Sequence, residues 1–266
     1  MPYRVDVPGD GNDAFDRLIE LGAFDADRLP DGRVAAVMPD SVTSEQIARA
    51  LGLGAEHVSV SPVSARDAGS VWVLGLRAVR AGRLRIVPAG TATEPADLQL
   101  LDGDAFGTGL HPTTRLCLEA LDELIDTTPP ESMLDVGTGS GVLALGALLL
   151  GVPHATGIDI DPRALGVAAA NARLNQVDGR MQLVEGGPEA IKGTWPLVAA
   201  NVLAAPLIEM APALVRRVGH HGHLVLSGIP SGVAEDVDQA YRRLGMRRAA
   251  TASLKGWTAL VLQASW

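Results

Sequence analysis

The hydrophobic positions between residues 132 and 201 alternate between short buried runs and longer helical stripes. The segments Met133 to Val136, Ala155 to Ile160, Met181 to Glu185 and Leu197 to Ala200 have the length and apolar character of buried strands. Helical patterns over Val142 to Leu150 and from Pro162 to Asn175 separate the first three. Strands that alternate with helices in this way predict an α/β fold with a parallel, doubly wound sheet.

The C-terminal part continues this pattern and then changes it. We predict helices over Leu207 to Val218 and Val233 to Leu244, with a strand at Leu224 to Ser227 between them. Arg247 to Leu254 and Trp257 to Gln263 predict a closing hairpin that turns at Lys255-Gly256. The expected sheet therefore has seven strands and ends in an antiparallel pair.

The N-terminal residues follow a different plan. We predict four strands there, at Tyr3 to Val7 (expected at a sheet edge), near Phe24, at Arg33 to Met38 and at His57 to Val60. Two short helices lie between them, one capped by Asn12 and one by the Thr43–Gln46 capping box. This order predicts a small ferredoxin-like α+β domain over residues 1–62. Residues 63–95 carry a thin signal, and we expect a solvated linker rather than a helix and strand. Residues 96–266 form the expected catalytic domain.

A glycine-rich turn follows the first strand of the larger domain. Gly137, Gly139 and Gly141 stand at alternate positions where the strand meets a helix. Glycine there allows a sharp turn and a close approach of a ligand to the main chain. Asp159 ends the next strand, at the distance expected for a carboxylate that binds ribose hydroxyls. This pattern predicts a cofactor that contains a nucleoside.

Two cofactor classes fit the glycines. The stretch from Gly139 to Ala144 matches the G-x-G-x-x-A pattern of dinucleotide-binding enzymes, which leaves a nicotinamide-dependent oxidoreductase open. Asp135 favours the other class, because a carboxylate at the tip of the first strand is unfavourable beside a pyrophosphate but suits a cationic ligand. S-adenosylmethionine carries a sulfonium and an ammonium group and no phosphate. We therefore favour S-adenosylmethionine.

Composition narrows the remaining classes. The net charge of −9 argues against a general nucleic-acid binder, and no apolar stretch is long enough to cross a membrane. The single cysteine, Cys117, lies on an apolar helical stripe and suits a reducing compartment, so we expect a cytoplasmic protein. His220, His221 and His223 lie in an expected turn without nearby cysteine or carboxylate partners, and we predict no metal site.

Three further motifs occur in one order with the glycine turn. They are Ala105-Phe-Gly-Thr-Gly-Leu-His111-Pro-Thr-Thr114, Gly157-Ile-Asp-Ile-Asp-Pro162 and Ala200-Asn-Val-Leu-Ala204. Together they resemble the PrmA family, the lysine methyltransferases of ribosomal protein L11, over about Leu101 to Ile229. The resemblance implies a class I fold and S-adenosylmethionine as cofactor. It also implies methylation of lysine side chains, with the N-terminal amine as a further acceptor, on a large-subunit ribosomal protein of the L11 family.

The resemblance also assigns residues. It implies cofactor contacts at Phe106, Gly107, Thr108, Thr114, Gly137, Gly139, Asp159 and Asn201, with Asn201 as the catalytic residue. Independently of the resemblance, a polar residue at the end of an apolar strand faces the crevice where open α/β sheets bind ligands, although Asn201 also suits a helix cap. We interpret His111 as a loop organiser rather than a base. The N-terminal third resembles the family only in its order of strands and helices. Of the family's aromatic linker pattern only Trp72 remains, and Leu76 stands where a second tryptophan is expected. Methylation of another amine-bearing protein or of a small molecule stays open.

Overall fold

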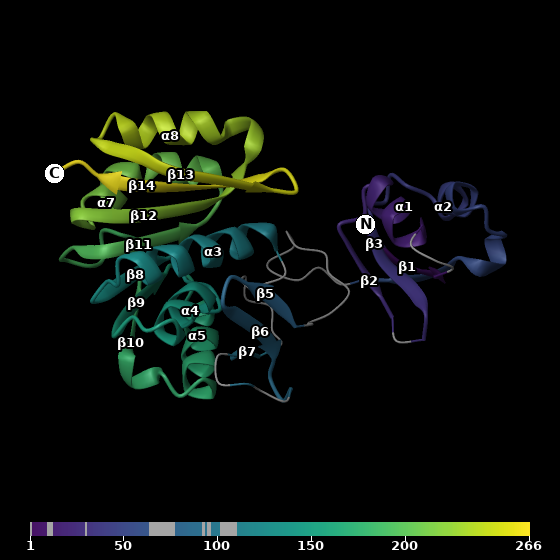
Figure 1. The fold of residues 1–266 in the computed structure, drawn as a ribbon, viewed down its shortest axis with the longest axis horizontal. Helices are drawn as coiled ribbons and strands as arrows, with labels where there is room; N and C mark the ends of the chain where they lie inside the picture. The colour runs from purple at the N-terminus through teal and green to yellow at the C-terminus, as the bar shows by residue number, and fades with distance from the viewer. Residues whose placement is uncertain are drawn as a thin grey trace. The chain divides into compact units, whose positions relative to one another are not determined.

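The computed structural model describes residues 2–9, 13–29, 31–63, 78–91, 94, 97–101 and 111–266. The chain divides into two units, Met1–Leu76 and Arg77–Trp266. Each unit is described here by itself (Figure 1).

The N-terminal unit is a four-stranded antiparallel sheet with two helices on one face. Its elements are β1 (Tyr3–Pro8), α1 (Asp13–Glu20), β2 (Asp25–Arg28), β3 (Arg33–Met38), α2 (Ser44–Leu51), a 3-10 turn at Ala55–His57, and β4 (Ser59–Pro62), with sheet order β2-β3-β1-β4. The βαββαβ order is as expected, and the capping box at Thr43 and Gln46 is present. The expectation of an edge position for β1 is wrong, because β1 pairs with β3 on one side and β4 on the other. Asn12, the expected cap of α1, lies outside the described residues.

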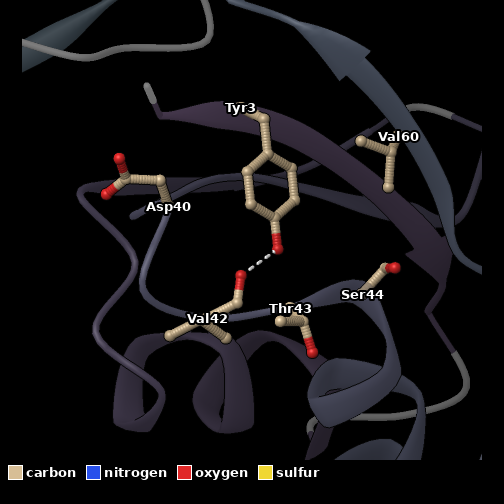
Figure 2. Close-up of a pocket in the computed structure, with 6 residues that line it drawn as sticks. All are labelled: Tyr3, Asp40, Val42, Thr43, Ser44 and Val60. Carbon is tan, nitrogen blue, oxygen red and sulfur yellow. Dashed lines mark hydrogen bonds between the residues drawn. The ribbon is translucent and has the colours of Figure 1, made fainter.

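A pocket of about 280 Å³ lies in this unit, between the start of α2 and the sheet. Its lining residues are Tyr3, Asp40, Val42, Thr43, Ser44 and Val60 (Figure 2). The Tyr3 hydroxyl donates to the carbonyl oxygen of Val42 and thereby holds the segment before α2 against β1. The residues of the cofactor motifs belong to the other unit.

The C-terminal unit contains the expected seven-stranded doubly wound sheet. In spatial order the strands are β10 (Met181–Glu185), β9 (His154–Asp159), β8 (Ser132–Val136), β11 (Trp195–Asn201), β12 (Val218–Pro230), β14 (Trp257–Ala264) and β13 (Met246–Leu254). The pairs from β10 to β12 are parallel, and β14 pairs antiparallel with both β12 and β13. The order reverses between β8 and β11, and open α/β sheets of this kind bind ligands at the carboxyl ends of the strands beside such a reversal.

Helices cover both faces of this sheet (Figure 1). One face carries α3 (Pro112–Thr127), α4 (Val142–Leu149) and α5 (Pro162–Leu174), and the other carries α6 (Ala204–Glu209), α7 (Ala211–Val215) and α8 (Ala234–Arg242). Two buried aliphatic clusters fill the layers, one on each side of the sheet. Among the described residues, none of the helices combines the length and apolar character needed to cross a bilayer.

Part of the segment expected to be a solvated linker is folded. The strands β5 (Val79–Ala81) and β6 (Leu84–Pro88) join β7 (Asp97–Leu100) in a three-stranded sheet. Leu84 and Ile86 are buried in the same cluster as α3 and α4. The arginines spaced two or three residues apart in this segment suggested solvent exposure. However, Arg85 forms an ion pair with the buried Asp97 (2.6 Å), so a charged residue is accommodated in a folded strand.

Three local predictions need correction. From the sequence, Thr113 or Thr114 is the expected N-cap of α3, because hydroxyl side chains favour that position. In the structure His111 is the N-cap instead, and Pro112 takes the first helical position. The region predicted as one helix from Leu207 splits into α6 and α7, since Pro212 lacks the N–H that would continue the ladder. Finally, His220, His221 and His223 lie inside the long strand β12 instead of a turn, with His221 at φ +53°.

Candidate functional site

The glycine turn, which contains Gly137, Gly139 and Gly141, joins the end of β8 to the end of β9 through backbone hydrogen bonds. The N–H groups of Gly137 and Thr138 both donate to the carbonyl of Ile158, each at 2.9 Å. Gly137 has φ +71°, and a Cβ at this position would lie 2.7 Å from Cγ1 of Val202. Glycine is therefore required here both for the turn and for the close approach of the chain after β11. Gly139 also has a positive φ, +55°.

Asp159 is held rigidly at the carboxyl end of β9. Its Oδ2 accepts from the N–H of Gly139 (2.9 Å), and its Oδ1 accepts from the N–H of Asp161 (3.0 Å). Each carboxylate oxygen can accept more than one hydrogen bond, so both keep acceptor capacity. The arrangement joins the predicted ribose-binding acid directly to the glycine turn.

Asp135 is a buried carboxylate at the tip of β8, with 1% of its surface exposed. Its Oδ2 accepts from the Thr138 hydroxyl (2.7 Å) and from the Ala144 N–H (3.3 Å). Its Oδ1 is buried and has no hydrogen-bond partner among the described residues. Burial raises the pKa of Asp135 to about 6, against the lowering effect of these two hydrogen bonds. An unpaired carboxylate oxygen of this kind is suited to a cationic ligand group.

Asn201 ends β11, and its side chain is almost buried, with 8% exposed. Its Nδ2 donates to the hydroxyl of Thr114, which comes from the first turn of α3, over 3.4 Å. Its Oδ1 is buried without a hydrogen-bond partner among the described residues. Leu203, not Asn201, is the N-cap of the following helix α6, which disfavours the interpretation of Asn201 as a helix cap.

His111 fixes the start of α3. Its Nδ1 accepts from the Thr113 N–H (3.3 Å) and lies 2.7 Å from the Thr113 hydroxyl. The ring meets the edge of Trp257 with 4.9 Å between centroids, so the start of α3 rests on the C-terminal hairpin. Burial lowers the pKa of His111 to about 4, which keeps the ring neutral at physiological pH. A neutral histidine that caps a helix agrees with the interpretation as an organiser.

The sequence analysis missed several side chains at this edge. Thr138 is buried and orients Asp135. Ile160 and Leu203 follow the two polar strand ends and are 79% and 62% exposed, an unusual exposure for large aliphatic residues. The sequence does contain a signal for both residues, because each is a large apolar residue close behind a polar strand end. Ile160 follows Asp159 directly, and Leu203 lies two positions after Asn201. Such surfaces suit a planar or apolar part of a ligand.

The structure brings five of the eight predicted site residues into one region. The Gly139 N–H donates to the Asp159 carboxylate, the Gly137 N–H donates to the carbonyl of Ile158 next to it, and Thr114 contacts Asn201. The remaining three, Phe106, Gly107 and Thr108, lie outside the described residues. The amide and carboxylates at this edge can bind a ligand with hydroxyl and ammonium groups, and the Asn201 oxygen can accept from an amine.

Comparison with known proteins identifies the family. Residues 30–265 match the family model of ribosomal protein L11 methyltransferase (PrmA). The chain belongs to the PrmA family. A relative from Geobacter sulfurreducens named ribosomal protein L11 methyltransferase is 37% identical over 97% of this chain and 91% of its own length. One of the same name from Pelobacter propionicus is 41% identical over 67% of this chain, and the match spans 60% of that protein.

Solved structures support the class I methyltransferase fold. A ribosomal protein L11 methylase from Lactobacillus delbrueckii subsp. bulgaricus is 27% identical, with a TM-score of 0.65 over 71% of this chain and 100% of that chain. A methyltransferase crystallised with SAH is 10% identical, with a TM-score of 0.50 over 59% of this chain and 50% of that one, a likeness that concerns the fold alone. The expected family and fold class are therefore confirmed.

Proposed function

We propose that this PrmA-family protein transfers methyl groups from S-adenosylmethionine to lysine side chains of ribosomal protein L11 in the cytoplasm, with the N-terminal amine as a further acceptor. The observation that carries the proposal is the Oδ1 of Asn201, which is buried without a hydrogen-bond partner among the described residues. It lies at the sheet edge that also carries the glycine turn and Asp159. An amide oxygen in that position accepts hydrogen bonds from an amine nucleophile. The family's named relatives support the substrate class.

The residues present fit S-adenosylmethionine better than a dinucleotide. Asp159 keeps acceptor capacity for ribose hydroxyls, and it is held beside the glycine turn by the Gly139 N–H. The buried Oδ1 of Asp135 would accept from the ammonium of the methionine part, whereas a pyrophosphate near it would meet like charge. When bound, the cofactor supplies an electrophilic methyl on a sulfonium, and the leaving thioether is neutral.

The protein's task is to present a neutral, aligned amine. A lysine amine has a pKa near 10.4 in water, so it arrives protonated. Desolvation at the site favours the neutral form. The Asn201 oxygen then accepts an amine N–H and aims the lone pair, whereas a carboxylate would hold the charged ammonium. Most of the rate enhancement would come from orientation, which can contribute several kcal/mol.

The test is a transfer assay with purified protein, purified ribosomal protein L11 and methyl-labelled S-adenosylmethionine, followed by mass spectrometry of the product. We expect label on lysine side chains of the substrate and none on a control protein of similar charge. Calorimetry with S-adenosylhomocysteine and NADH distinguishes the cofactor classes. Binding of NADH without binding of S-adenosylhomocysteine would support an oxidoreductase instead. Label transfer to small amines but not to ribosomal protein L11 would overturn the substrate assignment.

A further inference from the structure

Helix α5 carries two asparagines one turn apart on the side that faces β7. Asn175, the C-cap, forms two hydrogen bonds with Gln99 in β7: its Oδ1 accepts from the N–H (2.8 Å), and its Nδ2 donates to the carbonyl (2.7 Å). Asn171 accepts from the Leu101 N–H through Oδ1 (2.9 Å). β7 is the outer strand of its sheet among the described residues, so these side chains satisfy backbone groups along an edge that faces no further described strand.

Asn171 makes a second contact that Asn175 lacks. Its Nδ2 donates to the carbonyl of Ser140, within the glycine turn (2.9 Å). The side chain has 0% exposure, so losing either hydrogen bond would leave a buried polar group without a partner. The two backbone partners also fix the orientation of the amide, because Leu101 offers a donor and Ser140 an acceptor.

This contact joins the glycine turn, which the sequence analysis assigned to the cofactor, to the residue that follows β7. Ser140 stands between Gly139 and Gly141. Leu101 is the last described residue before residues 102–110, which include the predicted cofactor residues Phe106, Gly107 and Thr108. Helix α5 itself begins three residues after Asp159, capped by Asp161 with Pro162 at its first position. One buried amide therefore ties the glycine turn to the strand that leads into the predicted loop.

We infer that Asn171 is a positioning residue for cofactor binding, acting through the Ser140 carbonyl and the Leu101 N–H. It holds the glycine turn at a set position relative to the end of β7. Asn175 anchors the same strand without contacting the turn. This inference rests on the proposed function, since the ligand is S-adenosylmethionine or its demethylated product.

The first test compares Asn171→Leu with Asn175→Leu in the full chain. Both substitutions keep the branching at Cγ and remove hydrogen bonds to β7 or to Leu101 directly after it, and only the first releases the glycine turn. We expect the Kd for S-adenosylhomocysteine to rise about tenfold or more in Asn171→Leu and by less than about threefold in Asn175→Leu. Thermal unfolding of both variants identifies a shared loss of stability, which a purely structural role would produce in each. Equal weakening by the two variants would overturn the inference.

The second test uses Asn171→Asp and its pH dependence. An ionised carboxylate keeps the acceptor for Leu101 but faces the Ser140 carbonyl with a second acceptor, so binding should be weak at about pH 8. A protonated carboxyl offers one donor and one acceptor, as the amide does, and burial raises the pKa of the introduced group. We expect the affinity, relative to wild type at each pH, to recover as the pH falls to about 5.

For Asn171→Leu, the affinity for S-adenosylhomocysteine relative to wild type should not change with pH. A flat ratio for Asn171→Asp, or wild-type affinity at all pH values, would overturn the inference even if Asn171→Leu failed to fold. Wild-type protein that does not bind S-adenosylhomocysteine at all would instead contradict the proposed function. The two failures are thereby distinguishable.

Discussion

At the scale of single residues, the two carboxylates at the carboxyl edge of the sheet behave differently although both follow buried strands. Asp159 receives backbone N–H donors on both oxygens. Asp135 is almost fully buried and leaves one oxygen without a partner among the described residues. The presence of Asp135 in the sequence indicated a cationic ligand. The burial of Asp135 and its hydrogen bond with the Thr138 hydroxyl could not be predicted, since both depend on how the turn folds back.

Replacing Asp135 by asparagine should separate stability from binding. The folded-state pKa of Asp135 is raised to about 6, so the ionised form is disfavoured by burial, and this cost applies above about pH 6 and disappears as the pH falls toward 4. Asp135→Asn should therefore raise the free energy of unfolding of the ligand-free protein by about 1–2 kcal/mol at pH 7.5 and by less at pH 5.5. Urea unfolding at the two pH values measures this difference.

The same variant should bind S-adenosylhomocysteine more weakly, because the ammonium loses its carboxylate. The expected loss is about 1.5–3 kcal/mol, as for other hydrogen bonds to charged groups. A variant that is less stable than wild type at pH 7.5, or that binds equally well, would contradict this account of Asp135.

Asn201 allows a test of how the amine is received. Asn201→Ala removes the buried oxygen and the contact with Thr114, so turnover should fall more than cofactor affinity. Asn201→Asp keeps the shape but stabilises the ammonium form of lysine, which has no lone pair to attack with. The rate at neutral pH should therefore drop, and a higher pH should restore part of it. Rate profiles against pH at saturating cofactor measure this effect, and an aspartate variant equal to wild type throughout would exclude the mechanism.

At the scale of elements, the sequence predicted those features that local chemistry decides. The capping box before α2, the start of α5 at Pro162 and the turn at Lys255-Gly256 all occur as expected. Features set by distant contacts were wrong or missed. The cap of α3 depends on a histidine packed against Trp257, and β5 and β6 depend on the core beneath α3 and α4. The loop at Phe106 lies outside the described residues and stays a prediction.

Gly228 illustrates an element junction that only the three-dimensional structure explains. It has φ +84° at the bulge in β12, and a Cβ there would lie 2.2 Å from the carbonyl oxygen of Val202. Gly228→Ala should destabilise the protein by about 2 kcal/mol or more and shift the chain beside Asn201. Gly256→Ala is a matched control, since Gly256 has φ +78° but nothing within 4 Å of the added Cβ.

Chemical denaturation and the transfer assay measure the two effects. We expect both variants to lose the stability that a positive φ costs, and only Gly228→Ala to lose activity beyond that. Equal losses in the two variants would show that backbone strain alone, and not the contact with Val202, makes glycine necessary at position 228.

At the scale of the whole molecule, the two units differ in charge and have separate cores. Twelve of the 31 acidic residues and six of the 22 basic residues lie in the first 76 residues. The buried cluster of the N-terminal unit is made from β1 to β3, its two helices and Val58, and the clusters of the other unit start at Ala81. The sequence predicted this division from the change of pattern. The structure puts the boundary at Leu76 and assigns β5 and β6 to the second unit.

Removing the N-terminal unit should separate cofactor binding from recognition of the protein substrate. Every described residue assigned to the cofactor lies in Arg77–Trp266, so that fragment should bind S-adenosylhomocysteine within about threefold of the full chain. Its activity on ribosomal protein L11 should be lost, because an acidic N-terminal unit suits a substrate that presents positively charged lysine side chains. A short lysine peptide provides the control, since both forms should methylate it at the same low rate.

For the full chain, the KM for the intact substrate should rise with salt, as screening weakens attraction between unlike charges. A fragment that methylates intact ribosomal protein L11 as efficiently as the full chain would show that the N-terminal unit has a different task.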